Sequence, residues 1–93
     1  ARSNIQKEIT FLVDTLQINN TLKTLNLAWN RIGNSGANVI SKYLCTNKVL
    51  TELDLYANSI GAIGAKSLSE ALKVNKTLKY LDLAANDVGD GSA

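Results

Sequence analysis

The feature that most constrains this chain is a unit of 28 residues that occurs three times without a gap. The copies begin at Leu22, Leu50 and Leu78, and each follows the pattern LxxLxLxxNxIG, with Val in place of Ile in the third copy. The second half of the unit recurs as well, in residues 36–44 and 64–72. Repetition at a fixed period of this length is typical of a stack of coils in which each unit packs on its neighbours.

Each unit predicts a strand, a turn and a helix. The LxL core alternates with period two, which indicates short strands at residues 24–26, 52–54 and 80–82 with their leucines directed inward. We expect Gly33, Gly61 and Gly89 to serve the tight turn that follows. Gly36-Ala37 and Gly64-Ala65 are expected to open helices near residues 36–46 and 64–74, and their small side chains to allow close approach to the previous coil. Each helix is expected to bury one apolar stripe, Ile40/Leu44 in the first and Leu68/Leu72 in the second. Asn47 and Asn75 close these helices, where we expect the left-handed conformation that Asn tolerates.

One asparagine follows each predicted strand at the turn. A side-chain amide both donates and accepts, so it can satisfy backbone groups of a loop that has no regular pairing. When the coils stack in register, these side chains form an internal hydrogen-bonded ladder. The predicted structural asparagine ladder consists of Asn30, Asn58 and Asn86.

The chain is expected to form one segment over residues 1–93. Residues 1–20 lack the strand pattern and are either an N-terminal helix near residues 4–18, opened by a capping box at Ser3, or part of a repeat. Residues 21–48 and 49–76 are full repeats, and residues 77–93 are a partial one. We expect the segment to be a fragment of a longer array, or to associate end to end through an uncapped C-terminal edge.

This pattern resembles the leucine-rich repeat proteins, in their ribonuclease-inhibitor-like subclass. Ribonuclease inhibitor, the sensor domains of NOD-like receptors and Ran GTPase-activating proteins belong to the same subclass. The resemblance covers residues 9–93. It implies an α/β fold, a right-handed β-α superhelix with parallel strands on the concave face and helices on the convex face.

Composition excludes several classes of function. The chain has no His, one Cys and a net charge of +2, so it offers no imidazole base, no internal disulfide and no cysteine-rich zinc site. We therefore expect no enzymatic activity, no cofactor and no metal site. The small net charge argues against nucleic acid as a partner, and no apolar run is long enough for a membrane span. A half-exposed free thiol at Cys45 suits a reducing compartment, so we expect a cytoplasmic protein.

The concave face is the candidate site. Outward residues of neighbouring parallel strands lie about 4.8 Å apart, so they form columns that collect the only Trp, two Tyr and three carboxylates. Exposed aromatic side chains on a rigid sheet are typical of protein-binding hot spots. The residues predicted to contact a protein partner are Thr24, Asn26, Trp29, Glu52, Asp54, Tyr56, Tyr80 and Asp82. Two alternatives stay open: a regulator of a small GTPase, and a purely structural or truncated repeat segment without its own ligand.

Overall fold

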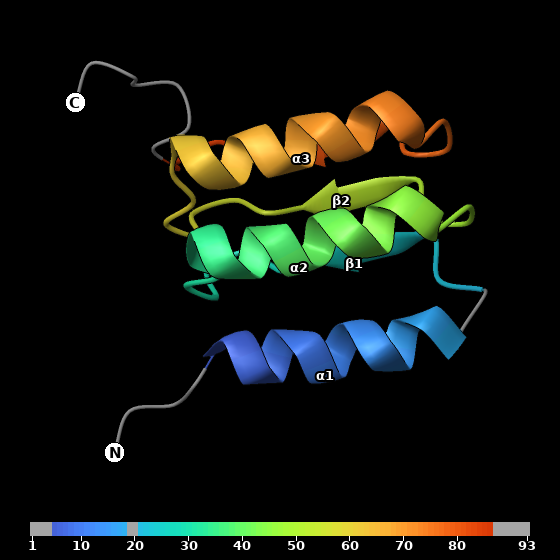
Figure 1. The fold of residues 1–93 in the computed structure, drawn as a ribbon, viewed down its shortest axis with the longest axis horizontal. Helices are drawn as coiled ribbons and strands as arrows, with labels where there is room; N and C mark the ends of the chain where they lie inside the picture. The colour runs from blue at the N-terminus through green and yellow to red at the C-terminus, as the bar shows by residue number, and fades with distance from the viewer. Residues whose placement is uncertain (1–4, 19–20, 87–93) are drawn as a thin grey trace.

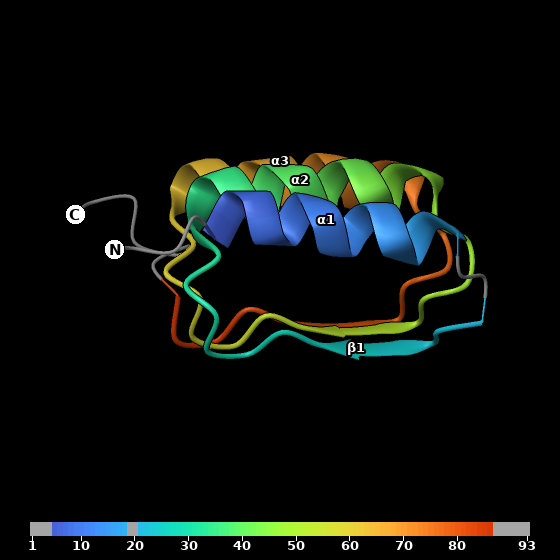
Figure 2. The ribbon, with the colours of Figure 1, turned by 90° about the horizontal axis from the view of Figure 1, so that it is seen from below.

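The fold consists of two layers, helices on one side and a parallel sheet on the other. The computed structural model describes residues 5–18 and 21–86. Its elements in chain order are α1 (Ile5–Ile18), β1 (Thr24–Asn26), α2 (Gly33–Thr46), β2 (Glu52–Asp54), α3 (Ala62–Val74) and β3 (Tyr80–Asp82). Figure 1 shows the three helices side by side, and Figure 2 shows all of them on the same side of the strands. This arrangement is the expected α/β solenoid.

The sheet confirms the predicted strands and their register. Its order is β1-β2-β3, and both pairs are parallel. Leu25, Leu53 and Leu81 are partners across the three strands. Neighbouring strands therefore differ by one 28-residue period, which places equivalent residues of successive repeats beside one another.

The core lies between the two layers and is most complete in the middle coil. Leu53, Leu55 and Ile60 of that coil are 0% exposed, because coils on both sides cover them. Leu83 occupies the position of Leu55 one repeat later and is only half-buried. Burial in this fold therefore depends on having a neighbour on each side.

Both complete repeats begin their helices earlier than the sequence pattern predicts. Helix α2 starts at Gly33 and α3 at Ala62, so Gly36 and Gly64 lie inside the first turns. At Gly64, an added Cβ would lie 2.8 Å from Ile60 Cγ2 and 2.9 Å from Ala37 Cβ. These glycines therefore allow the helix to pack closely on its own loop and on the preceding helix. The expected close approach to the previous coil is confirmed, but the helices start three and two residues before these glycines.

Two other local expectations need correction. Asn47 and Asn75 have extended backbones, with φ of −77° and −76°, so neither adopts the left-handed conformation. Gly33 does adopt it, with φ of +68°, but Gly61 has φ of −100°. An added Cβ at Gly61 would lie 3.3 Å from Asn34 Nδ2, so this glycine serves close packing against the Asn34 side chain. Gly89 and the predicted capping box at Ser3 lie outside the described residues.

Candidate protein-interaction surface

The candidate site is the face of the sheet that looks away from the helices, which we call the outer sheet face. Its side chains flank the inward leucines of each strand, because successive residues of a strand point to opposite faces. The register places Thr24, Glu52 and Tyr80 in one row. Asn26, Asp54 and Asp82 form the next row, and Trp29 and Tyr56 follow at the strand exits.

The aromatic residues of this face are accessible. Trp29 is 73% exposed and Tyr80 is 54% exposed, while Tyr56 is half-buried. The rings of Trp29 and Tyr56 meet edge to face, with centroids 5.5 Å apart and planes inclined by 69°. Such a pair presents a large apolar surface in a fixed orientation, which is what a protein-binding hot spot requires.

The row of Asn26, Asp54 and Asp82 has a structural role that the sequence pattern did not reveal. In each case Oδ1 accepts a hydrogen bond of 2.9 Å from the backbone N–H two residues later. These short turns hold the chain where the strand ends. The two aspartates keep a second carboxylate oxygen that a partner can use.

The carboxylates of Glu52, Asp54 and Asp82 give this part of the outer sheet face a negative charge. Asp82, with further contributions from burial, Asp54 and Glu52, raises the pKa of the Tyr80 phenol above its ordinary value. The cause is that a tyrosinate anion would lie beside negative charges. A partner that contacts this part of the sheet gains from positive charge.

Of the three asparagines in the predicted ladder, Asn58 and Asn86 connect neighbouring coils through their side chains. The Asn30 side chain donates within its own coil, to the carbonyls of Leu27 and Ala28. Asn58 is 0% exposed, and its Oδ1 accepts hydrogen bonds from the backbone N–H groups of Asn30 at 2.8 Å and Ile32 at 3.3 Å. Its Nδ2 donates to the carbonyl of Leu27 at 2.8 Å. Asn86 Oδ1 accepts in the same way from the N–H groups of Asn58 and Ile60, at 2.8 and 2.9 Å. These side chains serve the stack rather than the outer surface.

A second asparagine position of the repeat, held by Asn47 and Asn75, lies at the opposite ends of the coils, and there Asn75 also connects neighbouring coils. Asn75 is 7% exposed, and its Nδ2 donates to the carbonyls of Leu44 at 2.8 Å and Asn47 at 3.0 Å in the preceding repeat. Its Oδ1 accepts from the N–H groups of Thr77 and Leu78. The recurrence of Asn at these positions is the signal in the sequence, and at Asn75 its structural reason is a side-chain bridge to the preceding repeat and not a left-handed backbone.

Two hollows lie at the ends of the strands. One, of about 510 Å³, lies at the strand exits and is lined by Trp29, Arg31, Ala57, Ser59, Ala85 and Asn86. The other, of about 290 Å³, lies at the strand entrances and is lined by Thr51, Glu52, Lys79 and Tyr80. The predicted site residues thus border a hollow at each end, although Arg31 was not among them.

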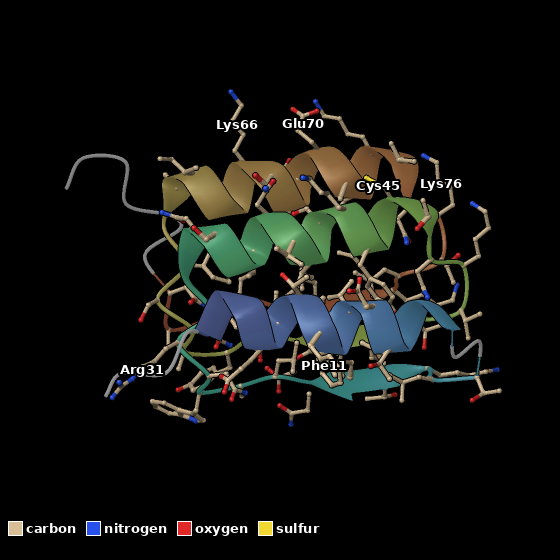
Figure 3. All side chains as sticks on the ribbon, turned by 60° about the horizontal axis from the view of Figure 1, so that its bottom comes forward. Phe11, Arg31, Cys45, Lys66, Glu70 and Lys76 are labelled. Atoms are coloured by element: carbon tan, nitrogen blue, oxygen red, sulfur yellow. The ribbon has the colours of Figure 1, made fainter. Side chains whose placement is uncertain are left out.

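The described residues offer little for metal or ion-pair chemistry. Within residues 5–18 and 21–86, no group of three His, Cys, Asp or Glu side chains could hold a metal ion. The one ion pair in the same ranges joins Lys73 to Glu70 at 3.4 Å on the helix surface. Figure 3 shows Lys66 and Glu70 directed away from the sheet on α3, and Cys45 is half-buried. Among the described helices, none has the length and apolarity needed to cross a membrane.

Comparison with known proteins decides the family. The profile of the family described as Leucine Rich repeat matches residues 19–41, 46–69 and 74–93, which is most of the chain. The chain belongs to the leucine-rich repeat family. No curated protein sequence matches this leucine-rich repeat chain.

A solved structure has the same architecture. The leiomodin-1 actin-binding site 2 (ABS2) superposes on this leucine-rich repeat chain with a TM-score of 0.81 and 28% sequence identity. The match covers 90% of this chain and 50% of that one, so this chain spans half the length of its structural neighbour. Family membership and this neighbour together support a protein-interaction module.

The two ends of the leucine-rich repeat stack differ from its middle. On α3, Leu72 and Val74 are 37% and 55% exposed, whereas Leu44, at the position of Leu72 in α2, is 0% exposed. Leu72 is therefore not buried as its helical spacing predicts, because no described helix packs beyond α3. At the other end, Phe11 on α1 is 74% exposed, and Figure 3 shows it directed outward.

Proposed function

We propose that this chain is a protein-interaction module that binds its partner on the outer sheet face. One observation carries the proposal: Trp29 is 73% exposed and its ring meets that of Tyr56 edge to face on the outer sheet face, so packing in the core does not account for it. Exposed aromatic residues of this size lose unfavourable contact with water when a partner covers them. Thr24, Asn26, Glu52, Asp54, Tyr80 and Asp82 surround this pair and complete the proposed contact surface.

Actin is the first partner to test. The support is the 28% identity to the leiomodin-1 actin-binding site 2 over 90% of this chain. Because this chain spans half of that structure, a contact site of the longer protein can lie partly outside the shared coils. The proposal for actin is therefore separate from the proposal for the outer sheet face, and the two need different readouts.

The test measures binding of monomeric and filamentous actin to the chain and to a Trp29→Ala, Tyr56→Ala, Tyr80→Ala triple variant. We expect the triple variant to bind at least about tenfold more weakly, which is the effect of losing a hot spot. Phe11→Ala is the matched control, since this aromatic is 74% exposed on α1. Equal binding by the triple variant would overturn the outer sheet face as the contact. Failure of both actin forms to bind would overturn actin.

A second partner class is a small GTPase, and its support is the resemblance of the repeat pattern to the ribonuclease-inhibitor-like subclass. The same test with a GTP-loaded Ran-type GTPase separates the alternatives, because an activating module accelerates GTP hydrolysis and a plain binder does not. In both cases we propose a cytoplasmic location, for which the half-exposed thiol of Cys45 is the support. The exposed Leu72 and Val74 of α3 support a further proposal, association between copies, which the Discussion tests.

A further inference from the structure

The hollow at the strand exits owes its shape to residues at two positions of the repeat. The first position holds Trp29, Ala57 and Ala85, and the second holds Arg31 and Ser59 in the two described repeats. The first repeat therefore contributes both large side chains, and the later repeats contribute only small ones. The result is a hollow of about 510 Å³, which we call the Trp29 hollow, with Trp29 and Arg31 as its two large lining side chains.

Backbone geometry does not explain why Trp and Arg occupy these positions. Trp29 and Arg31 have φ of +63° and +53°, in the left-handed region that favours Gly and Asn. Ala57, Ser59 and Ala85 have the same conformation, so it belongs to the coil and does not depend on the large side chains. A bulky residue is more strained in this conformation than Gly or Asn. Burial of the side chain does not compensate for the strain, because Trp29 and Arg31 are both exposed.

Arg31 is the charge that this arrangement leaves unpaired. It is exposed, and its guanidinium has no hydrogen-bond or ion-pair partner among the described residues. Figure 3 shows Arg31 extending from the loop end of the stack, well away from the labelled Lys66 and Lys76 on the helix side. A guanidinium presents a planar fork of donors that matches a carboxylate in a two-bond geometry.

We propose that the Trp29 hollow receives a bulky apolar side chain of a partner protein, with a neighbouring carboxylate of the same segment paired to Arg31. The inference deepens the proposed function and rests on it. The hollow is open to solvent, and its small lining residues Ala57 and Ala85 leave room beside the large side chain of Trp29. An acidic residue is favoured at this end because a basic one would face the unpaired Arg31. The carboxylates Glu52, Asp54 and Asp82 lie on β2 and β3 and do not line this hollow.

The probe is a set of blocked hexapeptides with the sequence Gly-Ser-Phe-Asp-Ser-Gly or with Phe-Asn, Phe-Lys or Ala-Asp at the centre. Binding to the intact chain is followed by amide NMR shifts at residues 29–31 and 57–59. We expect the Phe-Asp peptide to bind at least threefold more tightly than Phe-Asn, and the Phe-Lys and Ala-Asp peptides to bind most weakly. Equal affinity of Phe-Asp and Phe-Lys, or shifts confined to other residues, would overturn the proposal.

Two variants separate this inference from the proposed function. Arg31→Gln should remove the preference for Phe-Asp over Phe-Asn while leaving apolar binding intact. Ala57→Asn should narrow the hollow and weaken peptide binding, and Asn tolerates the left-handed backbone at that position. Both variants keep Tyr56 and Tyr80, and Phe11→Ala serves as the unaffected control. If the triple aromatic variant loses a protein partner but Arg31→Gln and Ala57→Asn bind the peptides like the wild type, this inference fails while the outer sheet face stands.

Discussion

The side-chain oxygen of Asn58 lies 2.8 Å from the backbone nitrogen of Asn30, 28 residues earlier in the chain. The same oxygen also accepts the N–H of Ile32 at 3.3 Å, and the Asn58 amide nitrogen donates to the Leu27 carbonyl. One buried side chain thus completes the loop of the preceding coil. The rigidity of the outer sheet face therefore depends on these hydrogen bonds between coils.

Replacing Asn58 by Ala should destabilise the fold strongly. The change leaves the backbone N–H groups of Asn30 and Ile32 without their hydrogen-bond acceptor. Each buried polar group without a partner costs about 1–3 kcal/mol. We expect a loss of about 2–4 kcal/mol in urea unfolding. Asn30→Ala is the matched control, because no described group donates to the Asn30 Oδ1 and Leu27 keeps its bond from Asn58. Equal losses in the two variants would contradict the ladder as the cause.

Two glycines should respond differently to substitution by Ala. At Gly64 an added Cβ meets Asn34 Oδ1 and Ile60 Cγ2 at 2.8 Å, so we expect a loss of about 1–3 kcal/mol from overpacking. At Gly33 nothing lies within 4 Å, and the loss of about 1–2 kcal/mol comes from the φ of +68°. Gly33→Asn should therefore recover part of the stability, whereas Gly64→Asn should not. Thermal unfolding of the four variants checks this, and a rescue at Gly64 would show the reasoning to be wrong.

The pKa of Tyr80 should make stability depend on alkaline pH. Asp82 and its neighbours raise this pKa above the ordinary 10.0, so the folded chain holds the phenolic proton more tightly than the unfolded chain. This stability is fully present below pH 10 and is lost as pH rises through the raised pKa. Asp82→Asn should lower the pKa of Tyr80, as followed by NMR of its ring, and Asp14→Asn on α1 should leave it unchanged. A Tyr80 pKa unaffected by Asp82→Asn would refute the assigned cause.

Trp29 fluorescence should report both exposure and binding. With 73% of the residue exposed, acrylamide should quench the only Trp readily in the monomer. A partner that covers the outer sheet face should then protect it. Strong protection in the isolated monomer would be incompatible with the geometry described for this face.

The exposed apolar end of α3 should promote association between copies. Leu72 and Val74 are 37% and 55% exposed, and burying such surface is favourable. Sedimentation at rising concentration should show oligomers for the wild type and fewer for a Leu72→Lys, Val74→Lys variant. Phe11→Lys tests the other end, since head-to-tail contact needs both ends and tail-to-tail contact needs only α3. A wild type that stays monomeric at about millimolar concentration would count against this prediction.

The stack, its period and the three parallel strands can be predicted from the sequence alone, because the same pattern of leucines, asparagines and glycines recurs in each of the three repeats. Even the register follows, since equivalent residues of a repeat must lie side by side. Local conformation was harder to predict. The bridging role of Asn75 and the early starts of α2 and α3 depend on contacts with the preceding coil, and a single repeat does not contain them.

The shape of the surface and the exposure of its apolar residues depend on the tertiary structure. The Trp29 hollow forms because a large residue in one repeat stands beside Ala57 and Ala85 of the next two, in a left-handed backbone that the pattern does not encode. Likewise, Leu44 and Leu72 occupy the same position in the repeat, yet one is fully buried and the other is 37% exposed. The physical reason is that a side chain in a stack is buried only where a neighbouring coil covers it. The periodicity of the sequence shows which residues of a coil are apolar, but not whether a neighbour covers them.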